Sequence, residues 1–171
     1  MRAASPAPGP SPAADLTRRA TFQDWACAII RYRDLDPNGH VNNGAINGFF
    51  EEGRIHFRRE ELIAGGRDTV TGVVVVRFDA RYRAALHFPG EVEIGTAILA
   101  VGGAGFTFGQ AIFQGETCIA TATVEAVFIH PETARAVRIP KEVRAVLVGA
   151  MAVNRPAQTE ANLNICGNGE R

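Results

Sequence analysis

The sequence predicts an α+β fold in which an antiparallel sheet of about five strands curls around one long central helix. Two observations support this prediction. Apolar residues recur with a helical period over one long stretch, residues 44–62, and with a period of two on both sides of it. Because one helix cannot cover both faces of a flat sheet, the sheet has to wrap around the helix.

The first strand is predicted just before the helix. Residues 25–30 alternate between two faces, with Trp25, Cys27 and Ile29 on one face, and the β-like pattern continues to about residue 32. The chain then passes through a polar segment, residues 34–43, before the helical period begins.

The helix is predicted over residues 44–62 because its apolar residues share one face. They recur at i, i+3, i+4, i+7 and i+11 and are Ile46, Phe49, Phe50, Gly53 and Phe57. Gly53 lies at the centre of this face, although a glycine inside a helix costs about 1 kcal/mol relative to alanine. A strand or a second subunit is therefore expected to approach the helix closely at this position.

Four further strands are predicted after Gly65 and Gly66, where the period of two continues to about residue 139. They cover residues 73–83, 92–98, 106–112 and 118–129, and turn residues separate them at 88–90, 102–103 and 114–117. These short connections predict an antiparallel meander. Its open edges and uncovered face favour pairing with a second copy of the chain.

Composition predicts one folded domain, residues 22–149, between two tails. Residues 1–21 are rich in Ala, Pro and Ser, and residues 150–171 collect Asn, Gly and Gln, so both segments are predicted to be disordered. The chain has 171 residues, of which 46% are hydrophobic and 21% charged, and this suits a single core.

Charge and cysteine content narrow the class of partner and the compartment. Eighteen basic and eighteen acidic residues cancel, which favours a small-molecule or protein partner over nucleic acid or an anionic membrane. Three widely spaced cysteines do not make a disulfide framework, and Cys27 and Cys118 are predicted to be buried thiols in strands. Because no run resembles a secretory signal or a membrane span, we expect a soluble cytoplasmic protein.

Residues 34–43 concentrate reactive side chains between the first strand and the helix. Two carboxylates, an imidazole and three amides occur there: Asp34, Asp36, Asn38, His40, Asn42 and Asn43. A carboxylate ahead of a helix can act as base or nucleophile, while the free N–H groups of the first helical turn stabilise negative charge on a substrate oxygen. A carboxylate combined with the free N–H groups of a helix start suggests acyl-transfer chemistry.

Three other interpretations of this segment stay open. Asp, Asn and Gly are common turn and cap residues, although a turn needs only one or two of them. Residues 34–39 fit the start of a calcium-binding EF-hand loop, but Ala45 stands where the closing glutamate belongs. Asp36 and His40 could ligate zinc or iron, but the other histidines are scattered and no C-x-x-C pair occurs. We therefore expect no metal and no organic cofactor.

A resemblance to a known family rests on two runs, Arg33-Asp34-Leu35-Asp36-Pro37-Asn38-Gly39-His40-Val41-Asn42-Asn43 and Phe49-Phe50-Glu51-Glu52-Gly53-Arg54. Together they resemble the signature of hot-dog-fold acyl-CoA thioesterases of the 4-hydroxybenzoyl-CoA thioesterase type. Residues 36–43 are also similar to a run in plant acyl-ACP thioesterases. The likeness extends from about Phe22 to Leu147. It departs from the family near Ile46, where an aromatic residue is often found, and residues 44–48 are small and glycine-rich.

The resemblance implies a hot-dog fold and hydrolysis of an acyl-CoA or acyl-carrier-protein thioester to a free acid and a thiol. It places the catalytic carboxylate at Asp36, assisting groups at Asn38 and His40, and a backbone N–H that holds the thioester oxygen at Asn43. It also implies a homodimer or homotetramer whose sites lie between subunits.

For the acyl pocket and the coenzyme A phosphate contacts of such a site, the sequence offers only candidate residues. Some of four phenylalanines could line an acyl pocket, namely Phe49, Phe50, Phe106 and Phe108. Six cations could hold coenzyme A phosphates, namely Arg81, Arg83, Arg135, Arg138, Lys141 and Arg144. Two alternative functions remain: a non-catalytic acyl-CoA-binding or sensing module on the same fold, and a hot-dog hydratase or dehydratase. The sequence shows neither a DNA-binding segment nor an Asp and His pair on the helix to favour them.

Overall fold

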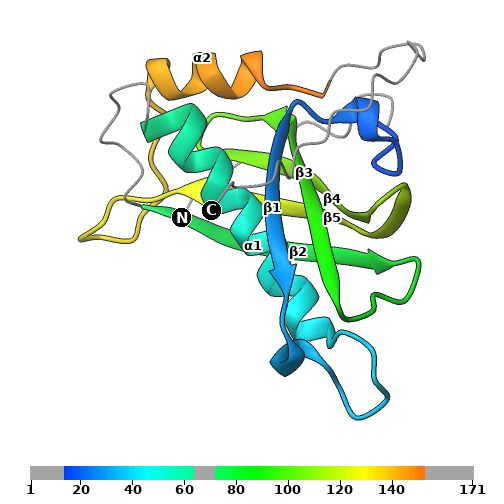
Figure 1. The fold of residues 1–171 in the computed structure, drawn as a ribbon. Coiled ribbons are helices and arrows are strands. Elements are labelled where there is room, and N and C mark those ends of the chain that lie inside the picture. The colour runs from blue at the N-terminus through cyan, green and yellow to red at the C-terminus, as the bar shows by residue number, and fades with distance from the viewer. Residues whose placement is uncertain (1–13, 64–71, 153–171) are drawn as a thin grey trace, which may run out of the picture.

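The computed structural model describes residues 14–63 and 72–152, which form one curled sheet with a helix inside it (Figure 1). Its strands are β1 (Asp24–Ile30), β2 (Val73–Tyr82), β3 (Gly90–Val101), β4 (Gly105–Gln114) and β5 (Thr117–Phe128). Its helices are α1 (Asn43–Phe57) and α2 (Lys141–Gly149), with short 3-10 turns η1 (Arg19–Thr21) and η2 (Tyr32–Asp34) and a π-helical turn η3 (Arg58–Ile63). The predicted α+β wrap is confirmed.

The sheet has the order β1-β3-β4-β5-β2, and every neighbouring pair is antiparallel. Strands β3, β4 and β5 form the predicted meander, but the prediction that β2 also belongs to it is wrong. β1 occupies the free side of β3, from Asp24 opposite Thr96 to Ile30 opposite Gly90, so β2 pairs with β5 at the other edge. Residues 83–89 therefore cross from one side of the sheet to the other instead of making a hairpin turn.

Helix α1 buries the apolar face predicted from the sequence. The buried residues of the helix are the predicted five, Ile46, Phe49, Phe50, Gly53 and Phe57. The α-helix ends five residues before the predicted Leu62, because the chain continues as the wider π turn η3. In an α-helix Leu62 would lie well off the face of Phe57, whereas about 4.4 residues per π turn return it to the core, where it is 1% exposed.

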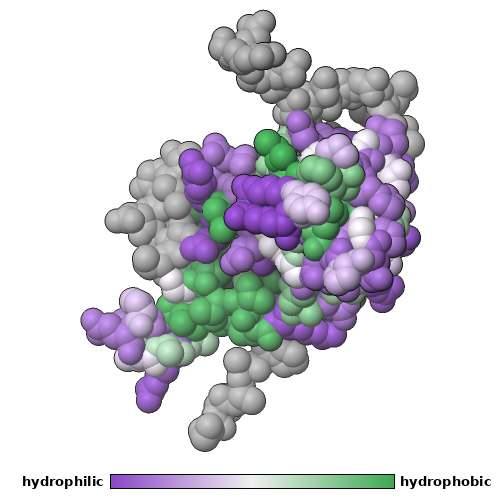
Figure 2. All heavy atoms as spheres, turned by 60° about the horizontal axis from the view of Figure 1, so that its bottom comes forward, coloured by the Kyte–Doolittle hydropathy of each residue, from purple (hydrophilic) through white to green (hydrophobic). Residues whose placement is uncertain are grey.

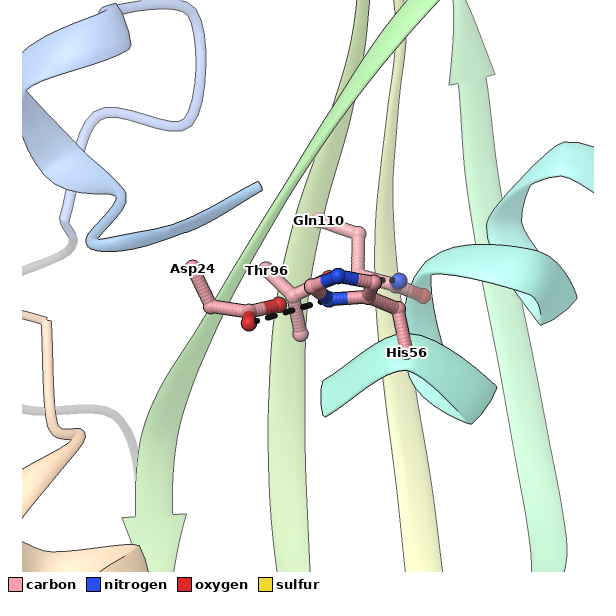
Figure 3. Close-up of polar contacts among 4 residues, drawn as sticks. All are labelled: Asp24, His56, Thr96 and Gln110. Carbon is pink, nitrogen blue, oxygen red and sulfur yellow. Dashed lines mark hydrogen bonds and ion pairs between the residues drawn. The ribbon is translucent and has the colours of Figure 1, made fainter. Parts of the chain in front are cut away.

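Close packing and buried hydrogen bonds fix α1 against β3 and β4 (Figure 3). The Nε2 of Gln110 donates to the Phe50 carbonyl at 3.0 Å and to Thr96 Oγ1 at 3.1 Å, and Arg54 Nη1 donates to Gln110 Oε1 at 2.9 Å. The amide of Gln110 is fully buried and all its hydrogen-bonding groups have partners. The close approach expected at Gly53 is confirmed, because an added Cβ would lie 2.5 Å from Ile94 Cγ2.

A second anchor holds the last turn of α1. His56 Nδ1 lies 3.3 Å from Asp24 Oδ1 at the start of β1, and Figure 3 shows the two side chains pointing toward one another. With contacts at its middle and its end, the helix has a fixed direction. Its first residue, Asn43, directly follows the polar loop that comes after β1.

The outer face of the sheet carries a smaller apolar cluster made of Phe22, Ala97, Ala111 and Phe113, with Leu16 and Trp25 packed against it. Arg19 caps this cluster, because its guanidinium lies 4.6 Å from the Trp25 ring centre and 2.9 Å from a Glu93 carboxylate oxygen. Residues 14–21, which composition assigns to a tail, thus lie on the outer face of β1, β3 and β4. Residues 1–13, 64–71 and 153–171, including the predicted Gly65-Gly66 break, lie outside the described residues.

The cysteine prediction needs a correction at Cys27. This residue lies on the exposed side of β1 and is disulfide-bonded. Ala26 and Ala28 take the core face of the strand, and the period of two turns Cys27 outward. Cys118 is a half-buried free thiol. Within the described ranges, none of the helices has the length and hydropathy needed to cross a membrane.

Candidate active site

The polar segment after β1 forms a tight, projecting loop in front of α1 (Figure 1). Its two limbs are bonded to each other, since the Asn42 N–H donates to the Asp34 carbonyl at 2.8 Å and the Asp36 N–H to the His40 carbonyl at 2.8 Å. Gly39 makes the turn at a φ of 77°, which glycine adopts without steric cost. The chemistry-bearing residues are therefore presented on a defined hairpin rather than a loose connection.

Asp34 and Asp36 have different surroundings within this loop. An oxygen of Asp34 accepts the Arg31 N–H at 2.7 Å and thereby closes the 3-10 turn η2. Asp36 Oδ1 accepts the N–H groups of Asn38 at 2.8 Å and His40 at 3.1 Å. Its second oxygen, Oδ2, has one long contact, 3.4 Å from the Asn38 amide nitrogen. Asp36 thus has an oriented carboxylate with one oxygen available.

The Asp36 carboxyl group is held in its charged form. Desolvation acts to raise its pKa, but the hydrogen bonds from the His40 and Asn38 N–H groups, the Asn38 amide and the nearby His40 side chain together outweigh it. The net result is a pKa below the ordinary value, so the group is a carboxylate at neutral pH. This is the protonation state that a general base or a nucleophile needs.

The start of α1, which follows this loop in the chain, offers backbone donors. Asn42 caps the helix, because its Oδ1 accepts the Gly44 N–H at 2.7 Å. Asn43 follows as the exposed first helical residue, and in the described part of the chain no acceptor bonds its N–H. A helix start has unpaired donors and a positive dipole end, which suit an oxyanion.

His40 has a ring partner that sequence reasoning missed. Its imidazole meets that of His87 edge to face, with ring centres 5.1 Å apart and planes at 69°. The backbone N–H of His40, by contrast, is the group that binds Asp36. Nothing in the sequence marks His87, because it lies on the connection between β2 and β3 whose path becomes visible only in the fold.

Residues 86–88 support the projecting loop from the side. The Val41 N–H donates to the Leu86 carbonyl at 2.9 Å, and Phe88 packs edge to face on Tyr32 with ring centres 6.0 Å apart. Together with the pair of histidine rings, these contacts join both limbs of the loop to one short segment. The candidate site is therefore assembled from two parts of the chain, residues 32–43 and residues 86–88.

Seven of the other candidate residues lie elsewhere in the fold. The four phenylalanines predicted for an acyl pocket are all core residues, at most 5% exposed: Phe49, Phe50, Phe106 and Phe108. Arg81 and Arg83 line a cavity of about 520 Å³ on the outer face of β2 and β5, beside Asp15 and Asp79. Arg144 donates to the Gly102 carbonyl. Among the residues described, no three His, Cys, Asp or Glu side chains gather as metal ligands would.

The curled antiparallel sheet around α1 defines a hot-dog domain, and solved structures share it. The PA5185 protein from Pseudomonas aeruginosa strain PAO1 is 27% identical, with a TM-score of 0.69 over 78% of this chain and 95% of that chain. A probable thioesterase from Bartonella henselae is 27% identical, with a TM-score of 0.60 over 70% and 99% of the two chains. A thioesterase from Thermus thermophilus, complexed with coenzyme A and Zn, is 22% identical, with a TM-score of 0.67 over 80% and 98%.

The family follows from the sequence match. The model of the thioesterase-like superfamily matches residues 30–147, and the chain belongs to this superfamily. The match includes Asp36, Asn38, His40 and Asn43. No curated protein sequence matches the chain.

Proposed function

We propose that this protein is a thioesterase that hydrolyses an acyl thioester to a free acid and a thiol, with Asp36 as general base or nucleophile. The observation that carries the proposal is the environment of Asp36: one oxygen held by two N–H groups and the other available, directly ahead of the start of α1. Membership in the thioesterase-like superfamily supports the same reaction.

In the general-base route, Asp36 Oδ2 takes a proton from a water molecule while the water oxygen attacks the thioester carbon. The carbonyl oxygen becomes an oxyanion, and the Asn43 N–H with the α1 dipole stabilises it, an effect worth about 10²- to 10³-fold per donor. The C–S bond then breaks, and the thiolate leaves and receives the proton from Asp36. In the nucleophilic route Asp36 Oδ2 attacks the carbon itself, the C–S bond breaks, and the thiolate leaves. Water then hydrolyses the resulting mixed anhydride to the free acid and the Asp36 carboxylate, and the proton released protonates the thiolate. Asn38 and the His40 ring orient the carboxylate or the water.

The proposed substrate is an acyl-CoA. An acyl-carrier protein, which carries the same thioester, is the alternative substrate. The coenzyme A bound to the Thermus thermophilus thioesterase supports the first choice. The test is release of free thiol from a panel of short, long, branched and aromatic acyl-CoAs and from an acyl-carrier protein. Saturable binding of one acyl-CoA without turnover of any substrate would replace the enzyme with an acyl-CoA-binding module.

We expect the pH dependence of this hydrolysis to lack an acid limb from Asp36 between pH 5 and 8. The lowered pKa keeps the active carboxylate ionised to a more acidic pH than an ordinary aspartate, whose pKa is about 3.9. kcat/KM is measured against pH for wild type and for His40→Gln, which removes the imidazole. An acid limb above pH 5 that persists in His40→Gln would contradict the assignment of Asp36 as an ionised base.

We further propose a homodimer formed through the open edge of β2. Among the described residues this edge has no neighbouring strand, and three consecutive valines on it are exposed: Val74, Val75 and Val76. Figure 2 shows a continuous hydrophobic area on the side of the molecule that faces downward in Figure 1. At the far end of β2 the Tyr82 hydroxyl donates to Asn47 Oδ1 at 3.2 Å, so a partner on this edge would approach the first turns of α1.

The chain should therefore sediment at no less than twice its 18.3 kDa mass at micromolar concentration. Val76→Lys places a charge on the most exposed of the three valines, and edge lysines oppose strand pairing. We expect this variant to sediment as a monomer and to lose activity. The matched control is Val148→Lys on α2, a valine 48% exposed and remote from β2. A fully active monomer would overturn the shared-site proposal.

A further inference from the structure

We propose that His87 is a positioning residue that orients the His40 imidazole at the site, an inference that rests on the proposed hydrolase function. The carrying observation is the edge-to-face contact of the two rings at 5.1 Å. Neither ring is bonded to another side chain within the described ranges. Besides the charge of the nearby Asp36 carboxylate, the His87 ring is the neighbour that orients the His40 ring.

His87 is a suitable support because its own backbone is fixed on both sides. Leu86, the residue before it, is 1% exposed in the core, and its carbonyl accepts the Val41 N–H. The His87 carbonyl accepts a hydrogen bond from Gln114 Nε2 at 3.3 Å. The next residue, Phe88, packs on Tyr32 at the other limb of the loop. The His87 ring is thus carried by a fixed segment, residues 86–88, that also bonds the loop containing His40.

The orientation matters because His40 has two separate tasks. Its backbone N–H is already committed to Asp36 Oδ1, so the position of its Cα is set by that bond. Only the ring can still rotate, and its direction decides whether an imidazole nitrogen reaches the water or the carboxylate. An edge-to-face ring pair restricts that rotation. A misdirected catalytic group costs rate even when it remains in place.

The test is a double-mutant cycle in the thiol-release assay. His87→Ala should lower kcat about 5- to 20-fold with KM changed less than about 2-fold, since the ring is misdirected while binding is retained. In a His40→Ala background the same change should cost less than about 2-fold, because the ring that it positions is gone. His87→Phe keeps an aromatic edge-to-face partner and should recover most of the lost kcat. Equal losses in both backgrounds, or no loss from His87→Ala, would overturn the proposal.

A second readout separates this inference from the proposed function. The His40 ring proton resonances should shift in His87→Ala, because a neighbouring aromatic ring is removed, whether or not the protein hydrolyses thioesters. The control is His130→Ala, an exposed histidine beyond β5 that should leave both kcat and the His40 resonances unchanged. If wild type releases no thiol, the proposed function fails and the catalytic role of His87 with it. If wild type is active but the His40 resonances do not move, the inference about His87 fails alone.

Discussion

Asp36→Asn is expected to lower kcat by at least about 10²-fold while leaving the free energy of unfolding nearly unchanged. The asparagine oxygen can still accept the N–H groups of Asn38 and His40, so the turn is retained. The Asn side chain has an NH₂ group in place of the available oxygen, and an amide neither takes a proton from water nor attacks a thioester. Single-turnover and steady-state thiol release, together with urea denaturation, measure the two quantities.

The matched control is Asp34→Asn, two residues earlier on the same loop. Asp34 bonds the Arg31 N–H and closes the η2 turn, a contact that an asparagine oxygen can also make. We expect this variant to keep most of the activity. If Asp34→Asn were the more damaging change, the catalytic carboxylate would have been assigned to the wrong residue.

Gly53→Ala is expected to destabilise the protein by about 2 kcal/mol, although alanine is the better helix former. Overpacking a core costs about 1 to 3 kcal/mol, and the upper end applies because the new methyl would meet the buried Ile94 at 2.5 Å and Gln110 at 3.0 Å. Ile94 cannot easily turn away, since β-branched side chains are stiff. The gain in helix propensity, about 1 kcal/mol, offsets only part of this cost.

Gly48→Ala is the control within the same helix. Apart from the adjacent residues and the backbone of the helix itself, nothing lies within 4 Å of a Cβ added at Gly48, so this substitution should stabilise the protein by up to about 1 kcal/mol. Both variants are compared by urea denaturation at one protein concentration, because subunit association would change the apparent stability. Effects of the same sign at the two glycines would show that close packing at Gly53 does not govern the helix position.

The sequence predicted which faces of the helix and strands are buried, but it predicted only part of the strand pairing. Periodicity identified the five strands and the buried face of α1, because the spacing of apolar residues along the chain shows which side of a helix or strand meets the core. It could not identify the partner of β2, since β5 and β3 offer equally apolar strands and the choice depends on where β1 pairs. It also predicted one continuous helix to Leu62, whereas the α-helix ends at Phe57 and a π turn carries Leu62.

Some parts of the candidate site could likewise be predicted from the sequence, and others depend on the fold. The loop residues from Asp34 to Asn43 are contiguous, so their proximity and the likeness to thioesterases could be recognised from the sequence. The different surroundings of Asp34 and Asp36 depend on which backbone N–H groups each carboxylate reaches, and the folded path of the loop determines this. His87 had no local signal, because its place beside His40 results from the crossing of residues 83–89.

The segment that covers the outer face of the sheet has a consequence for symmetry. Two sheets stack back to back only where each offers an accessible apolar surface, and such stacking would join two dimers into a tetramer. Over β1, β3 and β4 that surface is covered by residues of the chain itself, because Leu16 packs on the outer apolar cluster that contains Phe22, and Arg19 lies above Trp25. These residues therefore block stacking through this half of the sheet. The proposed association through the β2 edge, an isologous contact about one two-fold axis, would occupy that edge in both subunits and would therefore stop at two subunits.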